Sequence, residues 1–467
     1  MSLGEIHKFR FDDLRLVLDV NSGAVHAVDE VVWDLLSGDG AAPEAAARWS
    51  GKYPVEEIAT ALEEIDTLRR EGLLFSEPAL MDAALPFREA PVLKSLCLHV
   101  AHDCNLRCRY CFADTGPFGG LRGLMPLEVA RKAIDMLLVA SGARRQCEVD
   151  FFGGEPLLNF AVVQETVRYG RERAAAMGKE LKFTLTTNAT MLEGKVARFL
   201  LDNDINVVLS LDGRPAINDR MRFFADGTGS YNRIMPRIKA FVEEFNSRNR
   251  GRTYCYVRGT FTRENLDFAE DVRHLADAGF TEISMEPVVA TGDAGYAIRE
   301  EDLRVIEAEY DRLAGLYLQR RAEGNPFKFF HFNLNLEKAT CLSKRISGCG
   351  AGHEYLAVAP DGTLYPCHQF MGREGYAMGN VFDGEIDPGL RRKFREAQVL
   401  NKPGCAGCWA RLYCSGGCHA NAQLFSGDIY EPYEIGCRLQ KKRLECALGI
   451  QARIALEDQG WEESKAI

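Results

Sequence analysis

Cysteine is the residue type whose number and spacing point to chemistry in this chain. Fifteen cysteines occur among 467 residues, and eleven of them fall into two local arrays. An odd number of cysteines in a long chain without an export signal argues against a disulfide scaffold. Thiols that stay reduced and recur at short spacings indicate metal binding.

The first array is Cys104, Cys108 and Cys111, spaced Cys-x3-Cys-x2-Cys directly after an expected strand. Three thiolates on one loop can hold three irons of a [4Fe–4S] cluster, and the fourth iron then stays open for a chelating ligand. Zinc is one alternative, but a structural zinc site takes four protein ligands. Three unrelated buried thiols are a second alternative, which the tight spacing disfavours.

The second array lies in the last third of the chain and contains eight cysteines. They are Cys341, Cys349, Cys367, Cys405, Cys408, Cys414, Cys418 and Cys437. Eight thiolates suffice for two further [4Fe–4S] clusters, and two zinc sites are the alternative. The surrounding segment is loop-rich, which favours a fold held by metal centres rather than by a large core. An amphipathic helix is expected to follow it over about 438–458.

The elements that must position the first array alternate between strands and helices. Strands are expected at 95–101, 147–152, 182–187, 206–211, 253–261 and 282–287, with helix-sized stretches between them. Such repeats predict parallel strands with helical crossovers. Six repeats are too few for a closed eight-fold barrel, so the predicted fold class is α/β with a partial (β/α)6 barrel. Sites on such sheets lie at the carboxyl ends of the strands.

Glycine and polar residues follow these strands. Gly153-Gly154-Glu155-Pro156 comes after the second strand, Thr187-Asn188 ends the third, and Ser210-Leu211-Asp212-Gly213 ends the fourth. Glycines permit close approach of the backbone, and Glu155 can serve as the anionic partner of an ammonium group. Each motif alone is a weak signal, but together and in this order they indicate a binding site.

The sequence HDCNLRCRYCF around the first array resembles the cluster loop of the radical S-adenosylmethionine (radical SAM) enzymes. The resemblance implies a [4Fe–4S] cluster on Cys104, Cys108 and Cys111, whose open iron binds the methionyl group of SAM. Reduction of that cluster would release a 5′-deoxyadenosyl radical. The implied contacts to the cofactor come from Tyr110, Gly153, Gly154, Glu155, Asn188, Ser210, Asp212, Arg222 and Arg258.

Some of these assignments stay open at the level of sequence. Ala189 replaces the glycine that often follows Asn188 in the family, and Asn218 replaces the usual histidine of the motif that ends in Arg222. Tyr110 either packs near the adenine or is an ordinary core residue. Arg258 either holds a carboxylate of the cofactor or of a peptide, or forms a structural ion pair.

The second array, with CAGCWARLYCSGGC at its centre, resembles the SPASM domain of peptide-modifying radical SAM enzymes. The resemblance implies two auxiliary [4Fe–4S] clusters. Their ligands would be Cys341, Cys349, Cys367 and Cys418 for the first, and Cys405, Cys408, Cys414 and Cys437 for the second. Cys341 lies outside the densest motif, and exchange of this ligand would leave an open iron for a substrate thiolate.

Three short strands and a helix with Ile58, Leu62 and Ile65 on one face are expected before residue 77. This segment resembles the PqqD-like recognition element, a winged-helix-like module of enzymes that act on ribosomally made, post-translationally modified peptides (RiPPs). Such modules bind a leader peptide as an added strand. A plain cap on the barrel and a DNA-binding winged helix are the alternatives.

The predicted domains are therefore a RiPP recognition element over 1–80, a linker over 81–94, the partial barrel over 95–324 and the SPASM domain over 325–467. The formal net charge of −10 disfavours a nucleic-acid partner. No apolar run is long enough to span a bilayer, and no signal peptide is seen. We expect a soluble, cytoplasmic enzyme.

Stretches such as DFFGGEPL and GCGAGHEYLAVAPDGTLYPCHQF look most like the SCIFF (six-cysteine peptide) maturases. The resemblance implies thioether bonds between a cysteine sulfur and a carbon of another residue in a cysteine-rich precursor peptide, with flavodoxin or ferredoxin as electron donor. Carbon–carbon crosslinking and sulfatase maturation by formylglycine formation are the alternatives among enzymes. A metal-binding peptide scaffold without turnover is the alternative outside them.

Overall fold

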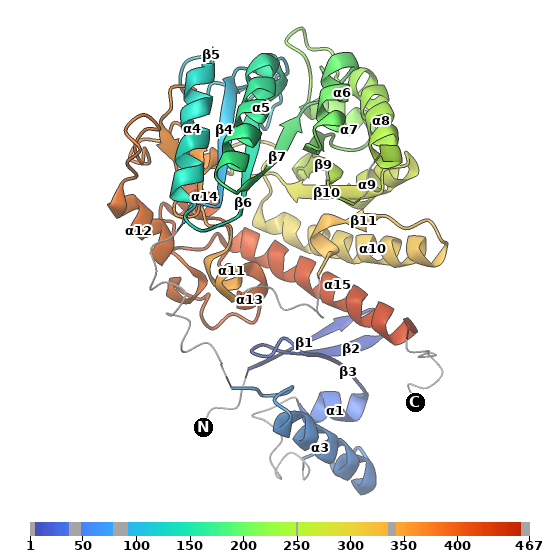
Figure 1. The fold of residues 1–467 in the computed structure, drawn as a ribbon. Helices are drawn as coiled ribbons and strands as arrows, with labels where there is room; N and C mark the ends of the chain where they lie inside the picture. The colour runs from blue at the N-terminus through green and yellow to red at the C-terminus, as the bar shows by residue number, and fades with distance from the viewer. Residues whose placement is uncertain (1–4, 37–47, 78–91, 249–250, 335–341, 459–467) are drawn as a thin grey trace.

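A parallel β-sheet with helices along its outer side forms the centre of the molecule (Figure 1), and the predicted α/β class is confirmed. A computed structural model describes residues 5–36, 48–77, 92–248, 251–334 and 342–458. The six predicted barrel strands are present as β4 (Ser95–His102), β6 (Gln146–Gly153), β7 (Glu180–Thr187), β8 (Asn206–Ser210), β9 (Cys255–Phe261) and β10 (Glu282–Pro287). The helices that accompany them are α4 (Leu127–Ala140), α5 (Phe160–Ala176), α6 (Gly194–Asp202), α7 (Pro215–Met221), α8 (Tyr231–Arg248), α9 (Phe268–Asp277) and α10 (Leu303–Ala322).

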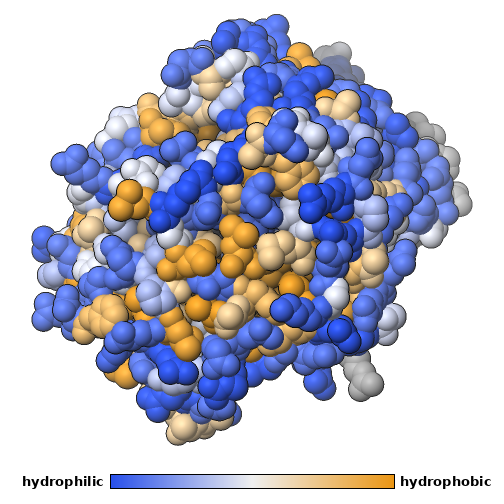
Figure 2. Space-filling model, turned by 90° about the horizontal axis from the view of Figure 1, so that it is seen from above, coloured by the Kyte–Doolittle hydropathy of each residue, from blue (hydrophilic) through white to orange (hydrophobic). Residues whose placement is uncertain are grey.

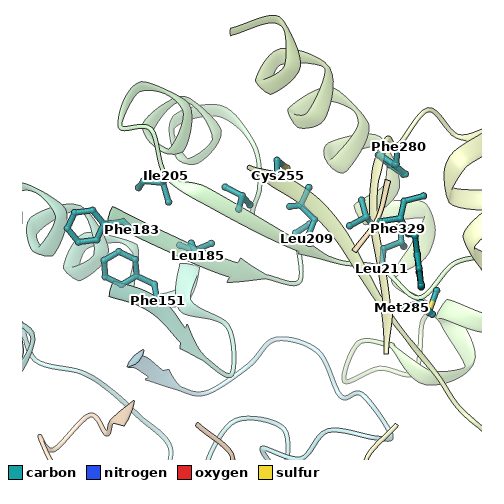
Figure 3. Close-up of a cluster of buried hydrophobic side chains, with 14 of the residues drawn as sticks. Phe151, Phe183, Leu185, Ile205, Leu209, Leu211, Cys255, Phe280, Met285 and Phe329 are labelled. Atoms are coloured by element: carbon teal, nitrogen blue, oxygen red, sulfur yellow. The ribbon is translucent and has the colours of Figure 1, made fainter. Parts of the chain in front are cut away.

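Burial alternates along β6, β7 and β9, which distinguishes the two faces of the sheet. In β7, Phe183 and Leu185 are fully buried, whereas Thr184 between them is only half-buried. Gly170 of α5 lies against Phe183, so the buried face is the one that the helices cover. Figure 3 shows this apolar layer, with side chains from several neighbouring strands in contact. The opposite face, which carries Thr184, lines the inside of the barrel.

The sheet extends beyond the six predicted strands at both edges. The strand order is β11-β10-β9-β8-β7-β6-β4-β12-β13, with the two-residue strand β5 (Gly123–Leu124) paired to β4. Strand β11 (Lys328–Phe329) is parallel to β10, and β12 (Tyr355–Val358) is parallel to β4. Strand β13 (Leu364–Tyr365) then turns back on β12. The segment that follows residue 325 is therefore joined to the barrel by main-chain hydrogen bonds.

The remaining C-terminal elements are short, apart from the last helix. They are α11 (Leu342–Ser347), α12 (Pro388–Glu396), α13 (Arg411–Cys414), α14 (His419–Ser426) and α15 (Glu434–Asp458). Helix α15 begins four residues before the predicted start, so Cys437 lies in its first turn rather than in a loop. It packs along α10 and separates the barrel from the N-terminal part (Figure 1).

The N-terminal part is a three-stranded antiparallel sheet with helices on one face. Its elements are β1 (Ile6–Phe11), β2 (Leu14–Asp19), β3 (Val25–Val28), α1 (Glu30–Leu35) and α3 (Val55–Arg70). The other face of the sheet meets α15, where a Cβ at Gly449 would overlap the ring of Phe11.

The N-terminal sheet also touches the segment that holds the densest cysteines. Arg411 of α13 donates hydrogen bonds to Glu5 and to Asn21, and Trp409 stacks on His7 with 3.9 Å between ring centroids. Most of the predicted linker over 81–94 lies outside the described residues. None of the described helices is both long and apolar enough to cross a membrane.

Candidate functional site

The first cysteine loop leaves the carboxyl end of β4, as predicted from the sequence. Cys104, Cys108 and Cys111 are all partly buried, and the three thiols act on one another electrostatically. The loop is held by a main-chain hydrogen bond of 2.7 Å from Arg107 to the carbonyl oxygen of Phe223. Burial raises the pKa of the Cys104 thiol to about 12 and that of Cys108 to about 11. Binding of a metal cluster there must therefore displace thiol protons.

The two glycines at the end of β6, Gly153 and Gly154, are packed directly against this loop. Gly153 has a φ of +131°, which L side chains rarely adopt, and a Cβ there would overlap the carbonyl oxygen of Ala101. A Cβ at Gly154 would overlap the carbonyl oxygen of Asp103, the residue before Cys104. The main chain after β6 thus approaches the cysteine loop so closely that no side chain fits between them.

Glu155 is a fully buried carboxyl beside the cysteine loop. Its oxygens accept hydrogen bonds from the Thr187 hydroxyl (2.8 Å), the Asn188 main-chain N–H (2.8 Å) and the Leu157 main-chain N–H (3.1 Å). Burial nevertheless raises its pKa to about 7. A carboxylate held in this way is a suitable partner for an ammonium group, which is the group that the resemblance assigns to it.

Asn188 reaches the cysteine loop from the end of β7. Its side-chain N–H donates to Asn105 at 2.9 Å and lies 3.6 Å from the Sγ atom of Cys104. Ala189, in the place where the family often has glycine, has a φ of +61°. The backbone therefore keeps the left-handed conformation that glycine favours, and the replacement does not displace Asn188 from the loop.

Tyr110, Asp212 and Arg222 form one hydrogen-bonded group beneath the loop. The Tyr110 hydroxyl donates to the Asp212 carboxylate at 2.6 Å and accepts from the Arg222 guanidinium at 3.0 Å. Asp212 and Arg222 are both buried, and the guanidinium also acts electrostatically on Cys108. Asn218, in place of a histidine, accepts a hydrogen bond of 3.3 Å from the Asp212 main-chain N–H.

Ser210, at the end of β8, is paired in register with Arg258 in the middle of β9. The Arg258 side chain is 49% exposed and forms an ion pair of 3.6 Å with Glu286. Glu286 in turn pairs with Arg443 of α15 at 3.1 Å. The ion pair that the sequence left open is present, and the exposed part of Arg258 faces the inside of the barrel.

The described cysteines of the second array fall into two groups that interact within each group. Cys349, Cys367 and Cys418 act on one another electrostatically, and we call them the first auxiliary group. The second auxiliary group consists of Cys405, Cys408, Cys414 and Cys437. These groups have the composition that the resemblance implies, except that Cys341 lies outside the described residues.

The described cysteines of both auxiliary groups are free thiols, and thiolates are the protein ligands of [4Fe–4S] clusters, one to each iron.

Aromatic side chains connect the first cysteine loop with the first auxiliary group. Phe112, next to Cys111, lies 5.8 Å from the ring of His368, which follows Cys367. Phe152, at the end of β6, is 5.0 Å from the same ring. Figure 2 views the molecule from the side on which β4 ends, and apolar side chains gather there in the middle of a hydrophilic rim. The two thiol sites therefore lie on either side of one aromatic layer.

Asp150 is an inward-facing carboxyl that the sequence reasoning missed. It lies in β6 beside Cys97 and Thr184, its register partners in the neighbouring strands. Burial raises its pKa to about 7. The alternation in CEVDFF could have shown it, since Val149 and Phe151 belong to one face and Asp150 to the other.

Asp150→Asn is expected to stabilise the protein increasingly as the pH rises. A carboxyl whose pKa moves from 3.8 to about 7 binds its proton more tightly in the folded state. The contribution of this bound proton to the free energy of unfolding is complete below pH 3.8 and is lost as the pH rises through 7. The change in the free energy of unfolding is on the order of 4 kcal/mol. The difference in Tm between the variant and the wild type should therefore widen between pH 5 and pH 8, as measured by thermal melts of the anaerobic protein.

The exposed residue Asp383 provides the control, because Asp383→Asn should leave Tm unchanged across this range. A difference between Asp150→Asn and the wild type that is constant with pH would contradict the elevated pKa.

Comparison with known proteins identifies the fold as a radical SAM barrel. Residues 98–260 match the Radical SAM superfamily, and residues 349–409 match the SPASM iron–sulfur cluster-binding domain. The chain therefore contains a radical SAM domain followed by a SPASM domain. A radical SAM domain binds a [4Fe–4S] cluster and SAM, and a SPASM domain binds auxiliary iron–sulfur clusters.

Relatives with curated names share parts of this architecture. The chain is 35% identical over 198 residues to an uncharacterized protein of Methanocaldococcus jannaschii, a match to 42% of this chain and 62% of that protein. It is 23% identical over 361 residues to a cysteine-type anaerobic sulfatase-maturating enzyme of Clostridium novyi, a match to 71% of this chain and 90% of that enzyme.

Two solved structures share the fold. The structure of anSMEcpe with AdoMet and the Cp18Cys peptide has a TM-score of 0.63 at 20% identity, and covers 79% of this chain and 100% of its own. SuiB of Streptococcus suis bound to its precursor peptide SuiA has a TM-score of 0.53 at 16% identity, and covers 93% of this chain and 98% of its own. The second match therefore extends over more of this chain than the first.

Proposed function

We propose that this enzyme forms thioether crosslinks between a cysteine sulfur and a carbon of another residue in a cysteine-rich, ribosomally made peptide. The observation that carries this proposal is the arrangement of two thiol sites on either side of one aromatic layer. The first cysteine loop supplies one side through Phe112, and the first auxiliary group supplies the other through His368. A peptide cysteine placed between them would lie close to a radical source and to a metal site that can take its sulfur.

The residues of the chain have separate tasks in this proposal. Cys104, Cys108 and Cys111 would hold the barrel cluster, and Glu155 would hold the amino group of SAM. The cluster and SAM together supply a 5′-deoxyadenosyl radical, which can remove a hydrogen atom from carbon. Arg258, half-exposed on the inner wall, would position a peptide carboxylate or carbonyl. Asp150 is the carboxyl on the same wall whose pKa suits proton exchange near neutral pH.

The N-terminal sheet supports a peptide substrate with a leader. Strand β3 is at the edge of the sheet and pairs only with β2 among the described strands, so an extended peptide can add beside it. The match to SuiB, whose structure contains a precursor peptide, includes 93% of this chain, whereas the sulfatase-maturating relative matches 71%. Leader binding at β3 would raise the effective concentration of the rest of the peptide at the barrel.

Formylglycine formation is the second candidate function. It is favoured by the match to the sulfatase-maturating enzyme of Clostridium novyi. Both reactions need a reductant for the barrel cluster, for which we propose flavodoxin or ferredoxin. They differ in the product, because one joins sulfur to carbon and the other converts a cysteine into an aldehyde.

The deciding experiment is the mass of a cysteine-rich precursor peptide after anaerobic incubation with reconstituted enzyme, SAM and a reductant. We expect the loss of two hydrogen atoms per crosslink, with one thiol lost to alkylation each time. The Cys104→Ala/Cys108→Ala/Cys111→Ala variant should leave the peptide unchanged and is the control. An aldehyde that reacts with a hydrazide would favour formylglycine formation. Deoxyadenosine release with an unchanged peptide from every cysteine-rich precursor tested would contradict the thioether proposal.

A further inference from the structure

Lys402 is a lysine buried inside the C-terminal part, where lysines are rarely found. It is 2% exposed and lies between the 3-10 turn Val399–Asn401 and Cys405. Its Nζ atom donates to the carbonyl oxygen of Gly416 at 2.9 Å and lies 3.1 Å from the Nδ1 atom of His419. Because an ammonium group can only donate, the His419 nitrogen that faces it must be the acceptor.

The acceptors of Lys402 lie on the chain that joins the two auxiliary groups. Gly416 lies between Cys414 of the second group and Cys418 of the first, and His419 follows Cys418 directly. The main-chain carbonyl of Lys402 also accepts a hydrogen bond of 3.1 Å from the N–H of Cys405. The side chain of Lys402 therefore holds the segment that connects the two groups, and its main chain holds Cys405.

The ammonium charge acts on both groups. The thiols of Cys349 and Cys418 in the first group, and of Cys405 and Cys414 in the second, all interact with it electrostatically. The second group is also influenced by Lys441, which acts on Cys405 and Cys437. Lys402 is thus shared between the groups, whereas Lys441 serves the second.

We propose that Lys402 is a positioning residue shared by the two auxiliary iron–sulfur sites, whose charge raises the reduction potentials of both clusters together. A cluster gains one negative charge when it accepts an electron, so a nearby buried cation stabilises the reduced form. Thioether formation releases one electron from the peptide besides the hydrogen atom and the proton that leave it. An auxiliary cluster would supply an acceptor for this electron, and the charge of Lys402 would stabilise the reduced form at both sites.

This inference rests on the proposed cluster ligands, and its test requires no peptide. The full-length chain is reconstituted anaerobically, and iron per chain and the midpoint potentials of the auxiliary clusters are measured by redox titration followed by EPR. The Cys104→Ala/Cys108→Ala/Cys111→Ala background removes the signal of the barrel cluster. Lys402→Gln removes the charge, Lys402→Arg keeps it, and Lys441→Gln is the matched control.

Lys402→Gln should shift both auxiliary midpoint potentials to more negative values, and Lys402→Arg should leave them near those of the parent. Lys441→Gln should shift the second cluster alone. If Lys402→Gln cannot be loaded, loss of iron from both sites with retention in Lys402→Arg supports the proposal. Unchanged potentials in Lys402→Gln, or a shift or iron loss confined to one site, would overturn it. Because the potentials are measured without peptide, a failure here leaves the thioether proposal standing, and a failure of that proposal leaves these potentials measurable.

Discussion

Replacing Gly154 by alanine should lower the rate of 5′-deoxyadenosine formation by about 100-fold or more. The added methyl group would overlap the carbonyl oxygen of Asp103, and neither atom can rotate away, because the main chain fixes the position of a Cβ and of a carbonyl oxygen alike. Relief of this overlap must therefore displace either the main chain that leads into Cys104 or Glu155, which follows Gly154. Misplacement by about 1 Å in a site of this kind costs on the order of 100-fold in rate. The measurement is deoxyadenosine released from SAM under reducing conditions, by chromatography.

Gly315→Ala is the matched control for this substitution. Gly315 lies inside α10 with no atom within 4 Å of an added Cβ, so alanine there should stabilise the helix by about 0.5–1 kcal/mol and leave the rate unchanged. Iron per chain separates the two causes of a low rate in Gly154→Ala. Retained iron with lost activity would show that SAM is misplaced, and lost iron would show that the loop itself has moved. A rate within about threefold of the wild type would refute the close approach of the two segments.

The barrel and its site could be predicted from the sequence because their signals are local. Each strand is a run of apolar residues followed by a turn, and parallel strands bring their carboxyl ends to one edge of the sheet. Glu155, Asn188 and Asp212 therefore lie near the cysteine loop although more than 50 residues separate the first from the last. The side chain of Asn188 is hydrogen-bonded to Asn105 of this loop, although Ala189 stands where the family often has glycine.

The features that the sequence did not reveal depend on contacts between distant segments. Strand β12 pairs with β4 across about 260 residues, and nothing in its short apolar run specifies that partner. Lys402 looks like a surface residue in the sequence, since its burial follows only from how the cysteine segments fold around it. The predicted start of the last helix, at about 438, is also four residues too late. Cys437 was therefore expected in the loop-rich segment, whereas it lies in the first turn of α15.

Arg222→Met is expected to be among the most destabilising substitutions at this site. Methionine keeps much of the volume of the side chain, but it leaves the fully buried Asp212 without its cation. The two charges are bridged by the Tyr110 hydroxyl, and removing one partner of such a buried charge pair costs up to about 3–5 kcal/mol. In a domain of this size, such a loss lowers Tm on the order of 10 °C. Thermal melts of the anaerobic protein would measure it, and SAM binding should weaken in parallel because Tyr110 loses a donor.

The double variant Arg222→Met/Asp212→Asn tests whether the lost charge pairing is the cause. It removes both charges, so it should be more stable than the sum of the two single variants predicts, by about 1–3 kcal/mol. Arg273→Met is the surface control, because Arg273 pairs with Glu270 and Asp277 on the exposed side of α9. Exposed pairs of this kind contribute about 0.5 kcal/mol or less, so its Tm should stay close to that of the wild type. Strict additivity in the double variant would mean that Arg222 stabilises the loop by packing alone, and that the charge of Asp212 is balanced by Tyr110 and the Thr260 main-chain N–H.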